Sequence, residues 1–233
     1  MAIKFAKPSE VALQQGLKAL IYGSSGAGKT VLCTTGDQPT LIVSAEAGLL
    51  SIKDVPGDIT VTEVRNLDEV GAVYQHLTTD SHYKTVALDS ITEIGEQCLA
   101  EELAKAGKDP RKAYGELITR MTALIKLFRD LPGRDVIMTA KIERIQDDTN
   151  RLLYSPGMPG AKLGPALPYF FDLVCPLRVE KDREGNLHRW LQTATDGQYI
   201  AKDRSGQLEM FEEPSIAKVK AAILGSKSTK KAA

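Results

Sequence analysis

Short apolar runs alternate with amphipathic segments through the first 140 residues of the chain. The runs are bounded by glycine, proline or polar residues, which is typical of buried strands. The predicted strands lie at 17–22, 40–44, 59–64, 84–88 and 135–139. Between them the apolar residues recur at helical spacing, which predicts helices at 30–35, 66–78, 91–106 and 111–129. Asn66 is the expected N-cap of the second helix.

The last third of the chain has a different pattern. It predicts a β-hairpin around the turn residues 184–186, a short strand and a final helix, at 172–179, 187–193, 199–202 and 216–224. Segment 141–162 contains two prolines and two glycines close together and is predicted to be a loop.

The fold class follows from the order of these elements. Strands that alternate with helices favour βαβ units, and hence a mainly parallel sheet flanked by helices. The later strands are expected to extend this sheet as an antiparallel C-terminal part. We therefore expect one α/β domain over residues 1–225, followed by a disordered basic tail at 226–233.

Composition narrows the class of protein. The 233 residues include 30 Lys plus Arg and 30 Asp plus Glu, and 42% of the chain is hydrophobic. These values exclude a disordered chain and a protein that coats nucleic acid through bulk charge, although a local basic groove stays open. Cys33, Cys98 and Cys175 lie too far apart to suggest a zinc site or a disulfide framework. The chain shows neither a signal peptide nor the roughly 18 apolar residues of a membrane span, so we expect a cytoplasmic protein.

One segment matches the phosphate-binding pattern G-x-x-x-x-G-K-[ST] in full. It lies between a predicted strand and a predicted helix, which is the context that the motif requires. Its residues are Gly23, Ser24, Ser25, Gly26, Ala27, Gly28, Lys29 and Thr30. Such a loop surrounds phosphates with backbone N–H groups. Lys29 is expected to reach the β- and γ-phosphates of ATP, and the Thr30 hydroxyl is expected to bind Mg²⁺.

Two carboxylates follow predicted strands and are expected at the same edge of the sheet. Asp89 ends the strand at 84–88 and is expected to hold Mg²⁺ through a water molecule, the alternative being a simple N-cap of the next helix. Glu46 follows the strand at 40–44 and is a candidate to orient or deprotonate the attacking water. The alternative for Glu46 is an exposed surface glutamate.

Together these motifs resemble the RecA-type ATPase core, in their order along the chain as well as in their residues. Ala45 to Leu49 is similar to the segment that carries the catalytic glutamate, and Asp89-Ser90 is similar to the end of the magnesium-binding strand. Lys141 stands where that family has a glutamine that senses phosphate. The compact chain resembles the short RecA-core P-loop proteins of bacteriophages, some of which anneal single strands or act as recombinases.

The resemblance also implies partners. Lys202 and Arg204 are similar to paired basic residues that reach a neighbouring subunit's ATP, which implies self-assembly into a filament or ring. The loop at about 141–160 corresponds to a DNA-binding loop. Its candidate contacts to single-stranded DNA are Lys141, Arg144, Arg151, Tyr154 and Lys162. A single-stranded DNA-binding protein is a further candidate partner.

We therefore expect an ATP- and Mg²⁺-dependent ATPase that binds single-stranded DNA and promotes annealing or strand exchange in phage recombination, in the host cytoplasm. Two alternatives stay open: an ATP-gated factor in phage replication or assembly, and a small-molecule P-loop kinase. A GTPase is disfavoured because Ala140 and Glu143 replace the residues that read guanine.

Overall fold

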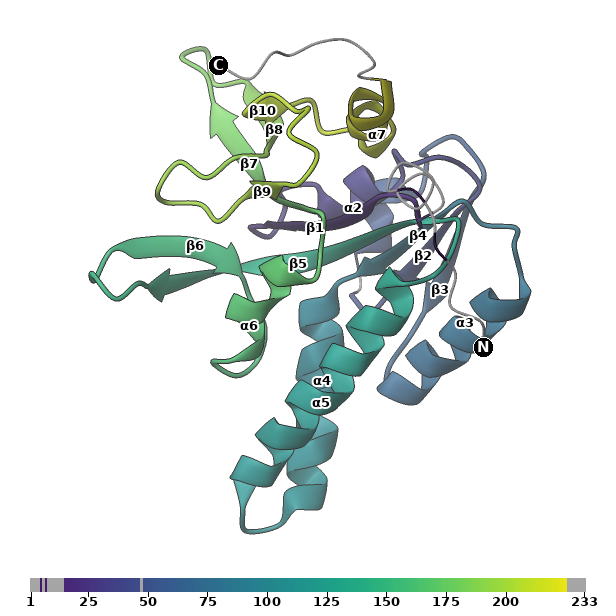
Figure 1. The fold of residues 1–233 in the computed structure, drawn as a ribbon, viewed down its shortest axis with the longest axis vertical. Helices are drawn as coiled ribbons and strands as arrows, with labels where there is room; N and C mark the ends of the chain where they lie inside the picture. Colours follow the sequence, from purple (N-terminus) through teal and green to yellow (C-terminus); the bar gives the residue numbers. More distant parts are fainter. Residues whose placement is uncertain (1–4, 6, 8–14, 47, 226–233) are drawn as a thin grey trace.

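The computed structural model describes residues 5, 7, 15–46 and 48–225, so the predicted tail at 226–233 lies outside the described residues. Within this part of the chain, ten strands form one sheet (Figure 1). They are β1 (Lys18–Gly23), β2 (Thr40–Ser44), β3 (Ile59–Glu63), β4 (Thr85–Asp89), β5 (Asp135–Gln146), β6 (Leu152–Pro156), β7 (Leu173–Lys181), β8 (Leu187–Gln192), β9 (Lys202–Asp203) and β10 (Phe211–Glu212).

The centre of the sheet is parallel. Its strand order is β7–β1–β5–β4–β2–β3, with every neighbouring pair parallel. Strand β5 therefore separates β1 from β4, and Met138 of β5 is in register with both Leu20 and Leu88. The predicted mainly parallel α/β fold is confirmed. Open parallel sheets place ligands at the carboxyl ends of their strands, and this edge carries the ends of β1, β2 and β4.

Helices cover both faces of the sheet. They are α2 (Lys29–Cys33), α3 (Leu67–Thr79), α4 (Ile91–Ala106), α5 (Pro110–Arg129), α6 (Leu163–Ala166) and α7 (Ile216–Gly225), with short 3-10 helices at Leu49–Ile52 and Leu167–Tyr169. As predicted, Asn66 caps α3, and its side chain accepts a hydrogen bond from the Glu69 N–H. No described helix is long and apolar enough to cross a membrane.

Alternate residues of each strand enter different halves of the core. Leu20 and Tyr22 of β1 pack with α3, α4 and α5, whereas Ala19 and Ile21 pack with α2 and α7. Strand side chains alternate between the two faces, so a strand covered on both sides is apolar throughout. This burial explains why β1, β2 and β4 were visible as continuous apolar runs.

The C-terminal part extends the sheet with antiparallel strands. Strand β7 pairs with β8 in the predicted hairpin, and β8 pairs with β10. The strand predicted at 199–202 overlaps the observed β9 only at Lys202, and the two residues of β9 pair with the start of β7. Strand β10 has only two residues, too few to form a recognisable pattern.

The prediction of a loop at 141–162 is wrong over half of its length. Strand β5 continues to Gln146 and pairs antiparallel with β6, so the two form a hairpin that projects beyond the parallel sheet (Figure 1). We call residues 141–156 the projecting hairpin. Beyond Ala140 the side chains of β5 are partly or fully exposed, and without a buried face they show no alternating apolar pattern.

Candidate nucleotide-binding site

The phosphate-binding motif forms a tight loop between β1 and α2. Gly26 and Gly28 have φ angles of 73° and 102°, a region that side chains other than glycine rarely adopt. The Lys29 ammonium lies inside the loop and donates hydrogen bonds to the carbonyls of Gly23 at 3.0 Å and Ser24 at 3.1 Å. Burial lowers the pKa of Lys29, and the nearby carboxylates of Glu46 and Asp89 oppose this shift. The negative charge of bound phosphates would therefore stabilise the buried Lys29 ammonium.

Thr30 and Asp89 meet beside the loop, as the sequence predicted. The Thr30 hydroxyl donates to Asp89 Oδ2 at 2.6 Å, and the Thr139 hydroxyl of β5 donates to Oδ1 at 2.5 Å. Asp89 is buried, with 2% exposure. A carboxylate with a neighbouring hydroxyl is a hard oxygen pair of the kind that Mg²⁺ takes from proteins. Phosphates and water would complete the coordination of Mg²⁺ around this pair.

Glu46 lies at the same edge of the sheet, directly after β2. Ser44 of β2 is in register with Asp89 of β4, which places the two strand ends side by side. The Ser90 hydroxyl donates to Glu46 Oε1 at 2.5 Å, and the Ser44 hydroxyl donates to the Glu46 carbonyl at 2.7 Å. The first bond holds the partly exposed Glu46 carboxylate, and the second holds the Glu46 backbone. The structure thus brings Glu46 together with Lys29, Thr30 and Asp89.

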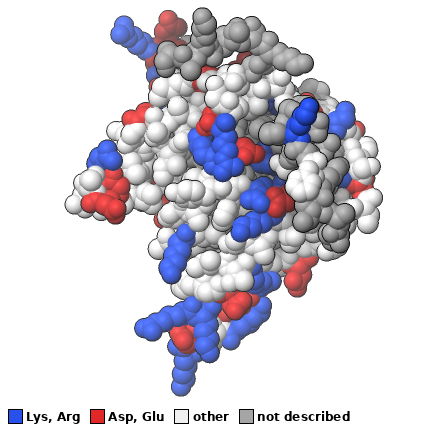
Figure 2. Space-filling view, in the orientation of Figure 1, with Lys and Arg blue, Asp and Glu red and all other residues white. Residues whose placement is uncertain are grey.

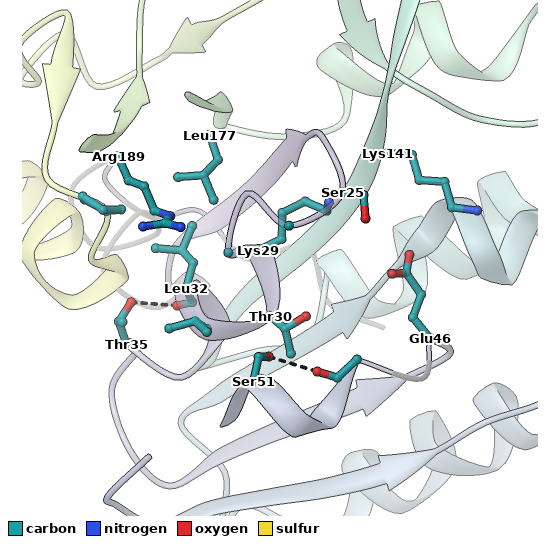
Figure 3. A pocket seen from close by; sticks show the side chains of 15 residues that line it. Ser25, Lys29, Thr30, Leu32, Thr35, Glu46, Ser51, Lys141, Leu177 and Arg189 are labelled. Carbon is teal, nitrogen blue, oxygen red and sulfur yellow. Dashed lines mark hydrogen bonds between the residues drawn. The ribbon is translucent and has the colours of Figure 1, made fainter. Parts of the chain in front are cut away.

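A cavity of about 680 Å³ opens over the loop (Figure 3). Lys29, Thr30, Glu46 and Lys141 are among its lining residues. The Lys141 ammonium is held by Glu93 at 2.9 Å and Glu96 at 2.8 Å, both on α4. Although partial burial opposes it, these two ion pairs raise the pKa of Lys141.

The position of Lys141 changes its predicted role. The residue was expected both at the position where the RecA family senses phosphate and at the start of a DNA-binding loop; it lines the nucleotide cavity and is paired with Glu93 and Glu96. No local signal could have revealed this, because Glu93 and Glu96 lie 48 and 45 positions away from Lys141 in the chain.

Arg189 is a cavity residue that the sequence did not reveal. It lies on β8, and its Nε donates to the Ala27 carbonyl at 3.0 Å, across 162 positions of the chain. Leu177 and Pro214 also line the cavity. No local motif surrounds Arg189, and only the folding of the β7–β8 hairpin over the loop brings it there.

Lys202 and Arg204 do not join this site. The Lys202 ammonium donates to the Pro168 carbonyl, and Arg204 forms an ion pair with Asp172 at 2.8 Å. Burial and the neighbouring Arg204 lower the pKa of Lys202. The backbone N–H of Arg204 donates to the Asp172 carbonyl, and the backbone N–H of Asp172 donates to the Lys18 carbonyl. Arg204 therefore lies beside the start of β1. That is about 17 Å along the strand from the phosphate loop.

Two side chains lie against Tyr154, the aromatic residue predicted to stack on a base. The guanidinium of Arg144 lies 5.5 Å from the centroid of the Tyr154 ring, and the ring of Tyr199 stacks on Tyr154 with 4.6 Å between centroids. The guanidinium of Arg178 lies 4.0 Å from the centroid of the Tyr199 ring. Tyr199 therefore occupies one face of the Tyr154 ring, and stacking of a nucleic-acid base on Tyr154 stays a prediction.

The remaining candidates for DNA contact are exposed but do not form a basic band. Arg151 is paired with Asp147 at 2.8 Å, and its side chain is 68% exposed. Lys162 is exposed just before α6. Figure 2 shows basic and acidic side chains intermixed on this face, with basic ones gathered at the turn between α4 and α5. Exposed basic residues there are Lys105, Lys108, Arg111 and Lys112.

The fold and the loop together define a P-loop nucleotide-binding domain. A family model described as an AAA domain matches residues 15–205, which is most of the chain. The chain therefore belongs to this AAA-domain family and is an AAA-type P-loop ATPase domain.

The chain shares little sequence with the individual protein of known structure described next. No curated protein matches the chain. One matching solved structure is an ATPase from the type III secretion system of pathogenic bacteria, with a TM-score of 0.49 and 17% identity. The match covers 72% of this chain and 53% of that one, so the chain spans about half the length of that ATPase.

Proposed function

We propose that this domain hydrolyses ATP in its P-loop cavity, with Glu46 as the group that orients and deprotonates the attacking water. The observation that carries the proposal is the position of Glu46: its carboxylate lines the same cavity as Lys29 and Thr30. Ser90 holds this carboxylate in place through a hydrogen bond. A base poised at the phosphate end is what hydrolysis requires, whereas nucleotide binding alone does not need one.

Each residue of the site has a distinct task. The loop around Gly26 and Gly28 binds phosphate oxygens through backbone N–H groups, and Lys29 exchanges its carbonyl partners for the β- and γ-phosphates. Thr30 and Asp89 hold the metal. When bound, Mg²⁺ neutralises charge on the phosphates. Glu46 accepts a proton from water at its carboxylate.

Three variants test this assignment by steady-state ATP hydrolysis and by ATP binding. Lys29→Ala should abolish binding and turnover. Glu46→Gln keeps the size of the side chain but not the base, so it should bind ATP normally and lose turnover by about 100-fold or more. Glu116→Gln, an exposed carboxylate on α5, is the matched control and should behave as wild type. Undiminished turnover in Glu46→Gln would refute the proposed base.

A second proposal concerns the projecting hairpin. We infer that it binds single-stranded DNA and that this binding changes the rate of ATP turnover. The support is mechanical: β5 carries Thr139, which touches Asp89, and continues without a break into the hairpin. A displacement of the hairpin can therefore reach the metal site along one strand. Annealing or strand exchange would be the activity that this coupling serves.

The test compares turnover with and without single-stranded DNA. Arg151→Glu reverses an exposed charge at the hairpin and should weaken both DNA binding and stimulation. Arg183→Glu makes the same change in the β7–β8 turn and is the control. Turnover that is indifferent to single strands would refute the coupling and favour the ATP-gated assembly factor or the kinase.

A further inference from the structure

Arg189 lies against the P-loop and has unused hydrogen-bond donors. Its Nε donates to the Ala27 carbonyl at 3.0 Å, and a Cβ built on Gly28 would lie 3.5 Å from the same nitrogen. Among the described residues, Arg189 forms no ion pair, and its two Nη groups have no protein acceptor. A planar cation without a carboxylate partner is thus held at the edge of the cavity.

The cavity has two chemically different ends (Figure 3). Glu46 and Lys141 lie at one end, with Lys29 and Thr30 between the two. At the other end Arg189 and Leu177 face the outer side of α2. The side chains of Glu46 and Lys141 therefore lie away from Arg189, which itself contacts the loop at Ala27.

The end near Arg189 carries apolar side chains, with Leu177 beside Arg189 and Leu32 of α2 nearby (Figure 3). Val31 and Pro214 also line the cavity. The hydroxyl of Thr35 also lines this end, but it donates to the Leu32 carbonyl at 2.7 Å and accepts from the Ile216 N–H at 2.9 Å. The Thr35 hydroxyl is already hydrogen-bonded and cannot donate to a phosphate. Apolar side chains at this end can instead pack against the flat face of an aromatic ring.

We propose that Arg189 stacks its guanidinium on the base of the nucleotide bound in the P-loop. This inference rests on the proposed function, because it takes the cavity to hold a nucleoside triphosphate. With the phosphates on the loop, the base lies toward the opposite end of the cavity, between Arg189 and the outer side of α2. A guanidinium stacks on aromatic faces, and the contact is worth about 0.5–2 kcal/mol, or between about twofold and thirtyfold in affinity.

The experiment separates contact with the base from contact with the phosphates. ATP and inorganic tripolyphosphate, each with Mg²⁺, are titrated by calorimetry into wild type and three variants. Arg189→Ala should weaken ATP between about twofold and thirtyfold and leave tripolyphosphate unchanged. Arg189→Lys keeps the positive charge but lacks the planar guanidinium that stacks on a ring. It should therefore not restore ATP affinity. Arg183→Ala removes a charge from the same hairpin away from the cavity and should match wild type.

The outcomes are distinct. Unchanged ATP affinity in Arg189→Ala overturns the proposal, and so does an equal loss of ATP and tripolyphosphate, or full rescue by lysine, since either places Arg189 on the phosphates. Circular dichroism checks that each variant is folded. If wild type binds neither ligand, the proposed nucleotide site itself has failed.

Discussion

Replacing Thr139 with valine removes one hydroxyl from beside the metal site and keeps the β-branched shape. That hydroxyl donates to Asp89 Oδ1 at 2.5 Å, and the two residues are 0% and 2% exposed. A hydrogen bond to a buried charged group contributes about 1.5–3 kcal/mol to stability. Thr139→Val should therefore lower the free energy of unfolding by about this amount. It should also raise the Mg²⁺ concentration for half-maximal turnover by about 10- to 100-fold, because Thr139 orients a metal ligand.

Urea unfolding and a Mg²⁺ titration of ATP turnover measure the two effects. Thr40→Val is the matched control, since Thr40 is also fully buried on a parallel strand and its hydroxyl is 3.4 Å from the Asp37 carbonyl, a long and weak contact. This control should lose less than about 1 kcal/mol and keep its Mg²⁺ dependence. Equal losses in the two variants, with an unchanged Mg²⁺ requirement in both, would refute the role given to Thr139.

Three further predictions concern self-assembly, pH and the backbone. Lys202→Ala combined with Arg204→Ala should lower turnover of the assembled protein while ATP binding by the monomer persists; normal turnover in the assembled state would contradict a role in a neighbour's site. Burial lowers the pKa of Lys18 to about 8 from an ordinary 10.5, so between these values the unfolded chain binds a proton that the native protein lacks. Stability relative to Lys18→Met should thus rise with pH across this window, by about 3 kcal/mol in total, and a flat difference in urea unfolding between pH 7 and 10.5 would contradict it. Gly16→Ala would place a Cβ 2.3 Å from the Arg134 carbonyl oxygen at a φ of +69°, and should lower the thermal midpoint by more than about 5 °C; an unchanged midpoint would show that the backbone relaxes freely.

Local chemistry made much of the fold predictable. The strands β1, β2 and β4 are covered on both faces, so their apolar runs are continuous and their limits were found to within a residue or two. The cap of α3 depends on Asn66 and the backbone of Glu69, which are three positions apart. By contrast, the projecting hairpin has no buried face along its outer part, and its strands left no alternation to detect.

The phosphate-binding loop was determined by the sequence alone. Eight consecutive residues supply its turn, its lysine and its threonine, so no distant part of the chain is needed to specify it. Glu46 and Asp89 could be placed at the same edge because both follow strands of one parallel sheet.

Only the tertiary structure decided what surrounds that loop. The insertion of β5 between β1 and β4 brings Thr139 to Asp89, and the β7–β8 hairpin brings Arg189 to Ala27. Contacts between residues 50 or 162 positions apart leave no spacing pattern in a single sequence. They depend on strand order and on the packing of side chains, which arise when the whole sheet assembles.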